Sequence, residues 1–162
     1  EEWPSWSPDG QWLTYSSTKD DNQEIYIARA DGSEKKRLTS DPALDAHPAW
    51  SPDGKKIAFS TSRWGDLELA VMNADGSELV RLTKSPGMDD YPAWSPDGKR
   101  LAFTSNRDGN LEIYTIDPDG QNPRNETNNQ AIDSFPSWTK NGRLTFVSNR
   151  EDGFDIYITP AR

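Results

Sequence analysis

Two ten-residue stretches decide the fold of this chain: D-A-H-P-A-W-S-P-D-G at residues 45–54 and D-D-Y-P-A-W-S-P-D-G at residues 89–98. They lie 44 residues apart, and the tryptophan in them recurs at the same step, as Trp6, Trp50, Trp94 and Trp138. A proline stands two residues before each of these tryptophans, a ring three before and a carboxylate five before. Such a fixed period is typical of architectures in which each repeat is one supersecondary unit. The chain therefore consists of about four 44-residue units.

Each unit is expected to hold four short antiparallel strands, which in the second unit cover residues 47–51, 56–61, 67–73 and 79–83. P-D-G at 52–54 joins the first pair, and A-D-G-S at 74–77 joins the last pair. Both have the composition of tight turns between strands. No segment has a sustained helical period, so the predicted fold class is all-β.

The third strand of each unit is apolar on both faces, as in I-Y-I-A at 25–28 and I-Y-I at 156–158. A sheet that is covered on both faces gives such a continuous apolar run. Four-stranded antiparallel sheets stacked radially satisfy this requirement, which predicts a β-propeller with the polar fourth strand at the outer edge. The expected blades of this single propeller domain or arc are residues 1–40, 41–84, 85–128 and 129–162. Glu126 occupies the position of Leu38 and Leu82, so we expect the third outer strand to be poorly paired.

The fourth unit stops after its third strand, so the last blade is incomplete and the chain offers roughly 3.7 blades. With no signal peptide and no initial methionine, the sequence is expected to be a mature or excised segment. An open arc would expose an apolar face at each end. We therefore expect a piece of a longer propeller, a four-bladed ring, or a homo-oligomer in which two chains close one ring.

Composition excludes several classes of protein. Acidic residues outnumber basic ones 27 to 18, for a net charge of −9, which argues against nucleic-acid binding. The chain has no cysteine and one histidine, which excludes thiol catalysis and zinc–thiolate sites. No apolar stretch is long enough to span a bilayer, so we expect no membrane insertion. No metal and no cofactor are predicted.

The sequence resembles the TolB-like, or PD40 (WD40-like), β-propeller repeats. The similarity rests on D-x-x-P-x-W-S-P-D-G at 45–54 and 89–98, L-E-I-Y at 111–114 and D-G-S-x-x-x-R-L-T at 75–83. It implies a propeller of six or seven blades whose first strands line a central channel. The family includes periplasmic TolB, which binds protein partners at the propeller. It also includes propellers that gate serine peptidases of the prolyl-oligopeptidase type.

The repeated carboxylates are the first candidates for a site. Asp45, Asp89 and Asp133 share one expected rim with the basic residues of the loop between the second and third strands, namely Lys19, Arg63, Arg107 and Arg150. Structural ion pairs are the favoured interpretation, because the acid recurs in every unit. The alternative is a ring of carboxylates that binds a cation or a basic ligand.

Residues that differ between units are the second set of candidates. His47 and Tyr91 stand where other units have Trp3 and Phe135, Asp90 replaces Ala46 and Ser134, and Trp64 lies in a rim loop. Aromatic anchors beside charges suit a protein interface. Packing against the neighbouring blade is the competing interpretation, favoured for Phe135. The candidate partner-binding residues are Asp45, His47, Trp64, Asp89, Asp90, Tyr91 and Asp133.

No G-x-S-x-G element is present, and Asp45 with His47 identifies no nucleophile, so we predict that the chain is not an enzyme. The predicted function is a non-catalytic scaffold, periplasmic or extracellular, that binds a protein or peptide on the rim of the channel. The alternatives are the gating propeller of a peptidase, a cation- or carbohydrate-binding propeller, and a chain made for propeller assembly that has no ligand.

Overall fold

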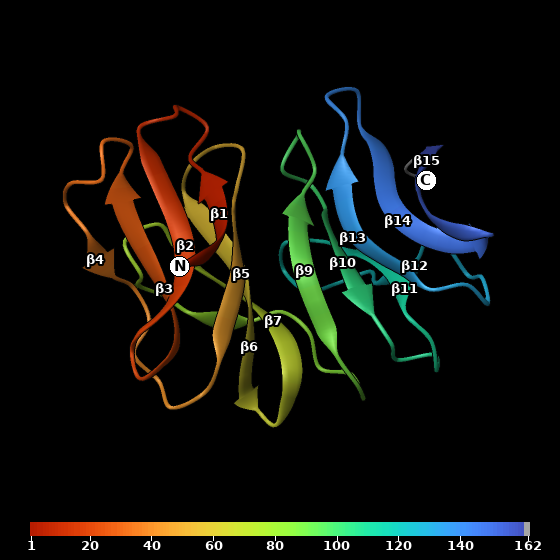
Figure 1. The fold of residues 1–162 in the computed structure, drawn as a ribbon, viewed down its shortest axis with the longest axis horizontal. Helices are drawn as coiled ribbons and strands as arrows, with labels where there is room; N and C mark the ends of the chain where they lie inside the picture. The colour runs from red at the N-terminus through yellow and green to blue at the C-terminus, as the bar shows by residue number, and fades with distance from the viewer. Residues whose placement is uncertain (161–162) are drawn as a thin grey trace.

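The computed structural model describes residues 1–160, which form fifteen β-strands and no helix (Figure 1). The first blade contains β1 (Glu2–Trp6), β2 (Trp12–Asp20), β3 (Asn22–Arg29) and β4 (Lys36–Arg37). The second contains β5 (Asp45–Trp50), β6 (Lys56–Trp64), β7 (Asp66–Asn73) and β8 (Val80–Arg81). The third contains β9 (Asp89–Trp94), β10 (Leu101–Ser105), β11 (Glu112–Ile116) and β12 (Arg124–Asn125). The fourth contains β13 (Asp133–Trp138), β14 (Arg143–Glu151) and β15 (Gly153–Pro160).

Each blade is an antiparallel sheet whose strands follow one another in chain order. The four-stranded blades of the prediction are confirmed, with three strands in the described part of the last blade. Several boundaries differ from the prediction in the second blade, where β5 covers Asp45–Trp50 and not 47–51. The hairpin of β6 and β7 extends out to Trp64 and Asp66, and the outer strand β8 is only two residues long. No helix in residues 1–160 has the length and apolar character needed to cross a bilayer.

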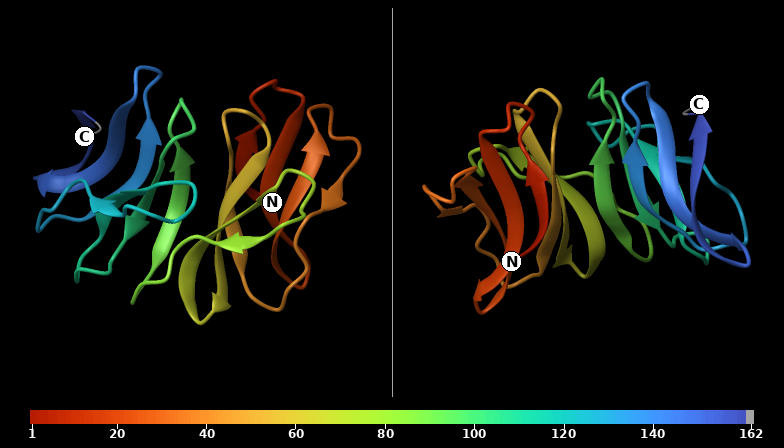
Figure 2. Two further views of the ribbon diagram at one scale, coloured as in Figure 1. Left: turned by 180° about the vertical axis from the view of Figure 1, so that it is seen from behind. Right: turned by 45° about the horizontal axis from the view of Figure 1, so that its top comes forward.

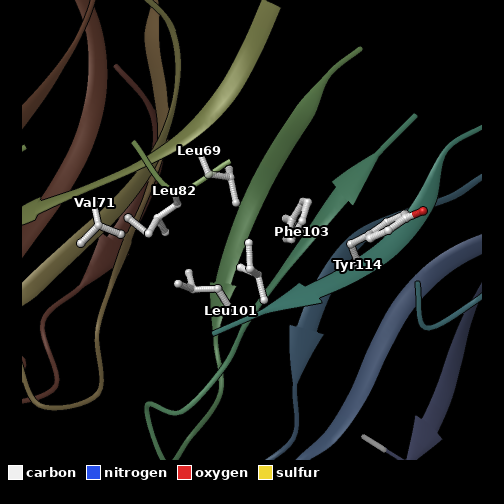
Figure 3. Close-up of a cluster of buried hydrophobic side chains, with 8 residues drawn as sticks. Leu69, Val71, Leu82, Leu101, Phe103 and Tyr114 are labelled. Carbon is white, nitrogen blue, oxygen red and sulfur yellow. The ribbon is translucent and has the colours of Figure 1, made fainter. Parts of the chain in front are cut away.

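The core lies between consecutive blades, which explains why the third strands are apolar on both faces. Figure 3 shows Leu69, Val71 and Leu82 of the second blade beside Leu101 and Phe103 of the third. Leu69, Leu101 and Phe103 are completely buried. Burying such a side chain stabilises the fold by roughly 1.5–3 kcal/mol relative to leaving it exposed. Equivalent clusters join the first blade to the second and the third to the fourth.

Two of the repeated tryptophans, Trp94 and Trp138, attach their blade to the preceding one. The indole Nε1 of Trp94 donates to the backbone oxygen of Ala49 at 3.2 Å, and that of Trp138 donates to Ala93 at 3.0 Å. Each of these two rings also packs against the core between the two blades that it joins. One side chain thus supplies both a hydrogen bond and apolar contact at the blade junction.

The four blades form an arc whose first and last members lie at opposite ends of the molecule (Figures 1 and 2). Trp6 on the first blade is 55% exposed, and Ile156 on the last is 77% exposed. Their counterparts inside the arc are covered by a neighbouring blade, Ile113 completely and Trp94 in part. The two end faces are therefore not packed against each other.

The expectation of a poorly paired third outer strand is wrong. β12 pairs with β11 through Tyr114 and Thr115, in the register of its counterparts. The backbone N–H of Glu126 donates to Ile113 at 2.8 Å, as that of Leu38 does to Ile25. The Glu126 carboxylate accepts a hydrogen bond from Thr115 Oγ1 at 2.7 Å. Backbone groups hold the strand, so the loss of the leucine is tolerated.

Candidate functional site

One rim of the arc carries both the D-x-x-P segments and the loops between the second and third strands, at the lower edge in Figure 1. Asn22 at the start of β3 donates through Nδ2 to the backbone oxygens of Asp41 and Ala43, at 2.6 and 2.9 Å. Asn110 makes the same two bonds to the connection between the third and fourth blades. These amides tie the rim loop of one blade to the segment that leads into the next.

The repeated carboxylates on this rim are buried and paired with arginine. Asp45, Asp89 and Asp133 have no exposed surface. The shortest nitrogen–oxygen distances are 2.5 Å for Arg63–Asp45, 2.9 Å for Arg107–Asp89 and 2.8 Å for Arg150–Asp133. Each arginine also lies over an aromatic ring of its own blade. The geometry is that of an ion pair within each blade. Among residues 1–160, no three acidic or histidine side chains gather as metal ligands would.

Burial changes the protonation of one of these acids, Asp45. It raises the pKa of the Asp45 carboxyl to about 6, although Thr61 and Arg63 act in the opposite direction. The pKa of Asp53, in the turn between β5 and β6, shifts in the other direction. Hydrogen bonds from Ser51 and from the Lys55 backbone lower it. Asp45 therefore takes up a proton under milder acidity than Asp53.

Four rings, one from each blade, meet at the axis of the arc, and we call Trp3, His47, Tyr91 and Phe135 the axial cluster. Ring centroids lie 4.7 Å apart for Trp3–His47, 4.2 Å for His47–Tyr91 and 4.5 Å for Tyr91–Phe135. Trp3 and Phe135 lie 6.4 Å apart and are stacked. The prolines that follow the four rings complete the lining of a cavity of about 270 Å³.

A shared backbone distortion holds the axial cluster together. All four residues have a positive φ, between 52° and 55°. Each lies where the register between the first and second strands shifts, as in a β-bulge. Bulges of this kind re-aim a side chain, and a positive φ is costly for residues other than glycine. The same strained position in every blade brings the four rings to one place.

Asp90 links two blades beneath the axial cluster. Its Oδ1 lies 2.6 Å from His47 Nδ1 and accepts a hydrogen bond from Ser60 Oγ at 2.6 Å. Asp90 is only 4% exposed, and both partners belong to the second blade. The two bonds end on one carboxylate oxygen, and in the described part of the chain Ser60 donates to Asp90 and not to His47. The three side chains are therefore not arranged as a serine nucleophile with its histidine base.

The structure separates the predicted site residues into three groups. His47, Asp90 and Tyr91 come together at the axis, where Trp3 and Phe135 join them. The three repeated aspartates lie in their ion pairs, and Trp64 lies apart at the tip of the β6–β7 hairpin. Trp64 is 37% exposed, with the Arg81 guanidinium 4.8 Å from its ring. The role of Ser60 was missed, because serine or threonine occupies this position in several units and gives no distinct signal.

These features define a β-propeller of stacked antiparallel blades with aromatic rings gathered at its axis. The sequence pattern of the PD40 family, the TolB beta propeller domain, matches residues 2–87 and 82–162. The chain belongs to this family. No curated protein gives a significant sequence match.

Two solved TolB structures are similar to the chain. Putative TolB from Agrobacterium tumefaciens is 28% identical with a TM-score of 0.86, over 98% of this chain and 60% of that one. TolB from Acinetobacter baumannii is 28% identical with a TM-score of 0.87, over 97% of this chain and 40% of that one. The chain thus spans about three-fifths and two-fifths of these proteins.

A Mycobacterium tuberculosis puromycin-hydrolyzing peptidase is also similar, at 15% identity and a TM-score of 0.72, over 96% of this chain and 26% of that one. At this identity the likeness concerns the fold alone.

Proposed function

We propose that this chain is a non-catalytic scaffold that binds a protein or peptide partner on the rim around its axis, with the axial cluster as the central contact. The observation that carries this proposal is the exposure of Trp3 and Phe135, each 44% accessible beside the axial cavity. Half-exposed rings held at one point resemble the aromatic anchors that dominate protein interfaces.

Charge and rigidity support the proposal. The strained backbone and the Asp90 bonds fix the rings before a partner arrives, so little side-chain entropy is lost on binding. The net charge of −9 favours a partner with a basic surface. The kinship with TolB supports a protein partner and a periplasmic or extracellular location.

The three repeated aspartates are assigned a supporting role in this proposal. Their carboxylates are buried in ion pairs and offer no surface to a partner. Trp64 is half-exposed on the same rim and would extend the contact outward from the axis.

A displayed library of random peptides, selected against the chain, tests the proposal. The selected peptides should bind the double variant Trp3→Ala/Phe135→Ala at least tenfold more weakly, since loss of an interface anchor costs about 2 kcal/mol. Val80→Ala, which shortens an exposed side chain on the outer edge, is the matched control and should leave affinity unchanged. Equal binding to both variants, each with native circular dichroism, would contradict the proposal. Trp64→Ala then measures how far the contact extends along the rim.

A further inference from the structure

The junction between the first and second blades contains a cavity of about 590 Å³. Both of its walls are four-stranded blades that follow one another in the chain. The cavity lies beside the P-D-G turns of both blades and the A-D-G-S turn at 74–77, at the opposite end of the strands from the D-x-x-P rim. Its volume is in the range of sites for small molecules.

The walls of the cavity are aromatic and aliphatic. Trp12 lines it from the first blade and Trp50 from the second, while Ile27 and Leu38 add aliphatic surface. The Arg29 guanidinium lies 4.2 Å from the centroid of the Trp12 ring, so this indole already takes part in a cation–π contact. Indole attracts cations more strongly than the other aromatic side chains do. The walls therefore suit a ligand that has both methylene groups and positive charge.

The mouth of the cavity is acidic. Four carboxylates and one ammonium group line it, which gives a formal charge of −3. These exposed side chains are Asp9, Glu34, Asp53, Asp75 and Lys36. Glu34 also pairs with Arg29 at 3.2 Å. A hydrogen bond from the Ser7 hydroxyl lowers the pKa of Asp9, and one from Ser77 lowers that of Asp75. These two aspartates therefore stay ionised in mildly acidic solution.

The equivalent cavities at the next two junctions have a different character. The cavity between the second and third blades has about 250 Å³, and Lys56 lines it at the position of Trp12. Its two carboxylates and one ammonium group give a formal charge of −1. The cavity between the third and fourth blades has about 410 Å³, with Arg100 at that position, and its lining has a formal charge of +1. Of these three cavities, the first is thus the largest and the most acidic, and it is the one lined by two tryptophans.

The Trp50 indole is also held differently from its counterparts. Trp94 and Trp138 donate through Nε1 to the preceding blade. Trp50 Nε1 is buried and has no hydrogen-bond partner within residues 1–160. This wall of the first cavity therefore lacks the bond that fixes the equivalent ring at the other junctions, and the ring can adjust to a bound molecule.

Two lysine ammonium groups already lie at the mouth of the cavity. Lys36 Nζ donates to the backbone oxygen of Asp75 at 3.0 Å, and Lys55 Nζ lies 4.0 Å from the Asp53 carboxylate. All four side chains are exposed, so a multivalent cation can displace these contacts at little cost. The two lysines indicate that the mouth accommodates primary ammonium groups on aliphatic chains.

We infer that this cavity binds a linear aliphatic polyamine. The methylene chain of the ligand lies along Trp12 and Trp50, and its ammonium groups pair with the carboxylates at the mouth. A triamine matches in charge the three aspartates there, Asp9, Asp53 and Asp75. The cavity shares no residue with the axial cluster, so this inference does not rest on the proposed function.

Isothermal titration calorimetry with spermidine, a triamine, tests the inference. We expect one molecule to bind per chain with a Kd below ~1 mM in about 0.15 M salt. Asp9→Asn/Asp75→Asn should weaken binding at least tenfold, since two charge-assisted bonds are lost. Asn141 occupies the turn position of Asp9 in the fourth blade and accepts the same kind of hydrogen bond, so the asparagine turn still forms. Asp97→Asn/Asp119→Asn removes the two equivalent carboxylates of the third blade, and this matched control should bind normally.

Two further variants test the wall of the cavity and its resident ammonium group. Trp12→Lys copies the residue of the second blade, and it should abolish detectable binding because a cation replaces the indole. Lys36→Met should tighten binding about threefold, since it removes an ammonium group that competes at Asp75. Circular dichroism establishes that each variant is folded.

Four results would overturn the inference. They are no binding at ~1 mM spermidine, equal weakening by the two double variants, unchanged binding by Trp12→Lys, and weaker binding by Lys36→Met. Equal weakening would show that spermidine responds to the net charge of −9 and not to this cavity.

Discussion

Asp89 begins the first strand of the third blade with both carboxylate oxygens 2.9 Å from the Arg107 guanidinium. Arg107 in turn lies 4.4 Å from the centroid of the Tyr114 ring. A charge that is completely buried must be paired, and removing one partner leaves the other uncompensated. Asp89 thus joins the D-x-x-P segment to Arg107 of the rim loop, and Arg107 in turn contacts Tyr114 of the third strand.

We predict that Asp89→Ala lowers the free energy of unfolding by about 3 kcal/mol, because the Arg107 charge is left without its partner. Urea unfolding followed by tryptophan fluorescence measures the change. Asp119→Ala is the control in the same blade, since Asp119 is exposed and bonds only to the backbone of its own turn. If both variants lose the same stability, the ion pair has no special structural role.

The ion pairs also mark a limit of the sequence. The 44-residue period predicted an acid and a base on one rim. It could not show that the acids are buried, because their burial depends on residues far away in the chain. The members of the axial cluster could be identified from the sequence, because a ring stands three residues before each repeated tryptophan. Its convergence depends on a positive φ that the sequence gives no reason to expect at Trp3, Tyr91 or Phe135.

At the scale of the element, the turn between the third and fourth strands of a blade packs against the preceding blade. A Cβ on Gly120 would lie 2.8 Å from the backbone oxygen of Leu82, and one on Gly76 would lie 3.1 Å from that of Leu38. A Cβ on Gly32, in the first blade, would have no atom within 4 Å. The glycine is therefore required for close approach as well as for its backbone conformation.

Gly120→Ala is expected to destabilise the chain more than Gly32→Ala. The two residues have nearly the same φ, +83° and +82°, so the cost of the left-handed conformation, about 1 kcal/mol, is common to both. The clash with Leu82 should add about 1–3 kcal/mol in Gly120→Ala alone. The difference between the two unfolding free energies in urea isolates this contact, and equal values would show that the turn can move away.

Strands were the most predictable elements, because the apolar runs of the third strands and the P-D-G and D-G turns are local signals. The outer strands were less predictable. The sequence indicated strands of about five residues, and the structure has two-residue strands secured by Thr39, Thr83 and Thr127. Side-chain bonds between residues fourteen or more positions apart give no periodic signal.

For the whole molecule, the two ends of the arc are complementary. The last blade presents Ile156, whose counterparts Ile25 and Ile113 pack against a following blade. The first blade presents Trp6, whose counterparts pack against a preceding one. Such different but complementary surfaces produce head-to-tail association.

We expect the mass measured by light scattering to rise above 18.2 kDa as the concentration increases. Ile156→Lys should shift this rise to higher concentration, because it places a charge in the apolar contact. Gln121→Lys, which adds the same charge to an exposed turn, should have no effect. A mass of 18.2 kDa at all concentrations would contradict head-to-tail association.

The sequence by itself determined the repeat, the four blades, the all-β class and the positions of the turns, because each is set by spacing and by residues close together in the chain. Only the tertiary structure decided which side chains share a site. Asp90 reaches His47 across 43 residues, and Trp3 stacks on Phe135 across the whole arc. The reason is physical: a blade folds from local pairing, whereas the axis and the edges exist only once the blades are stacked.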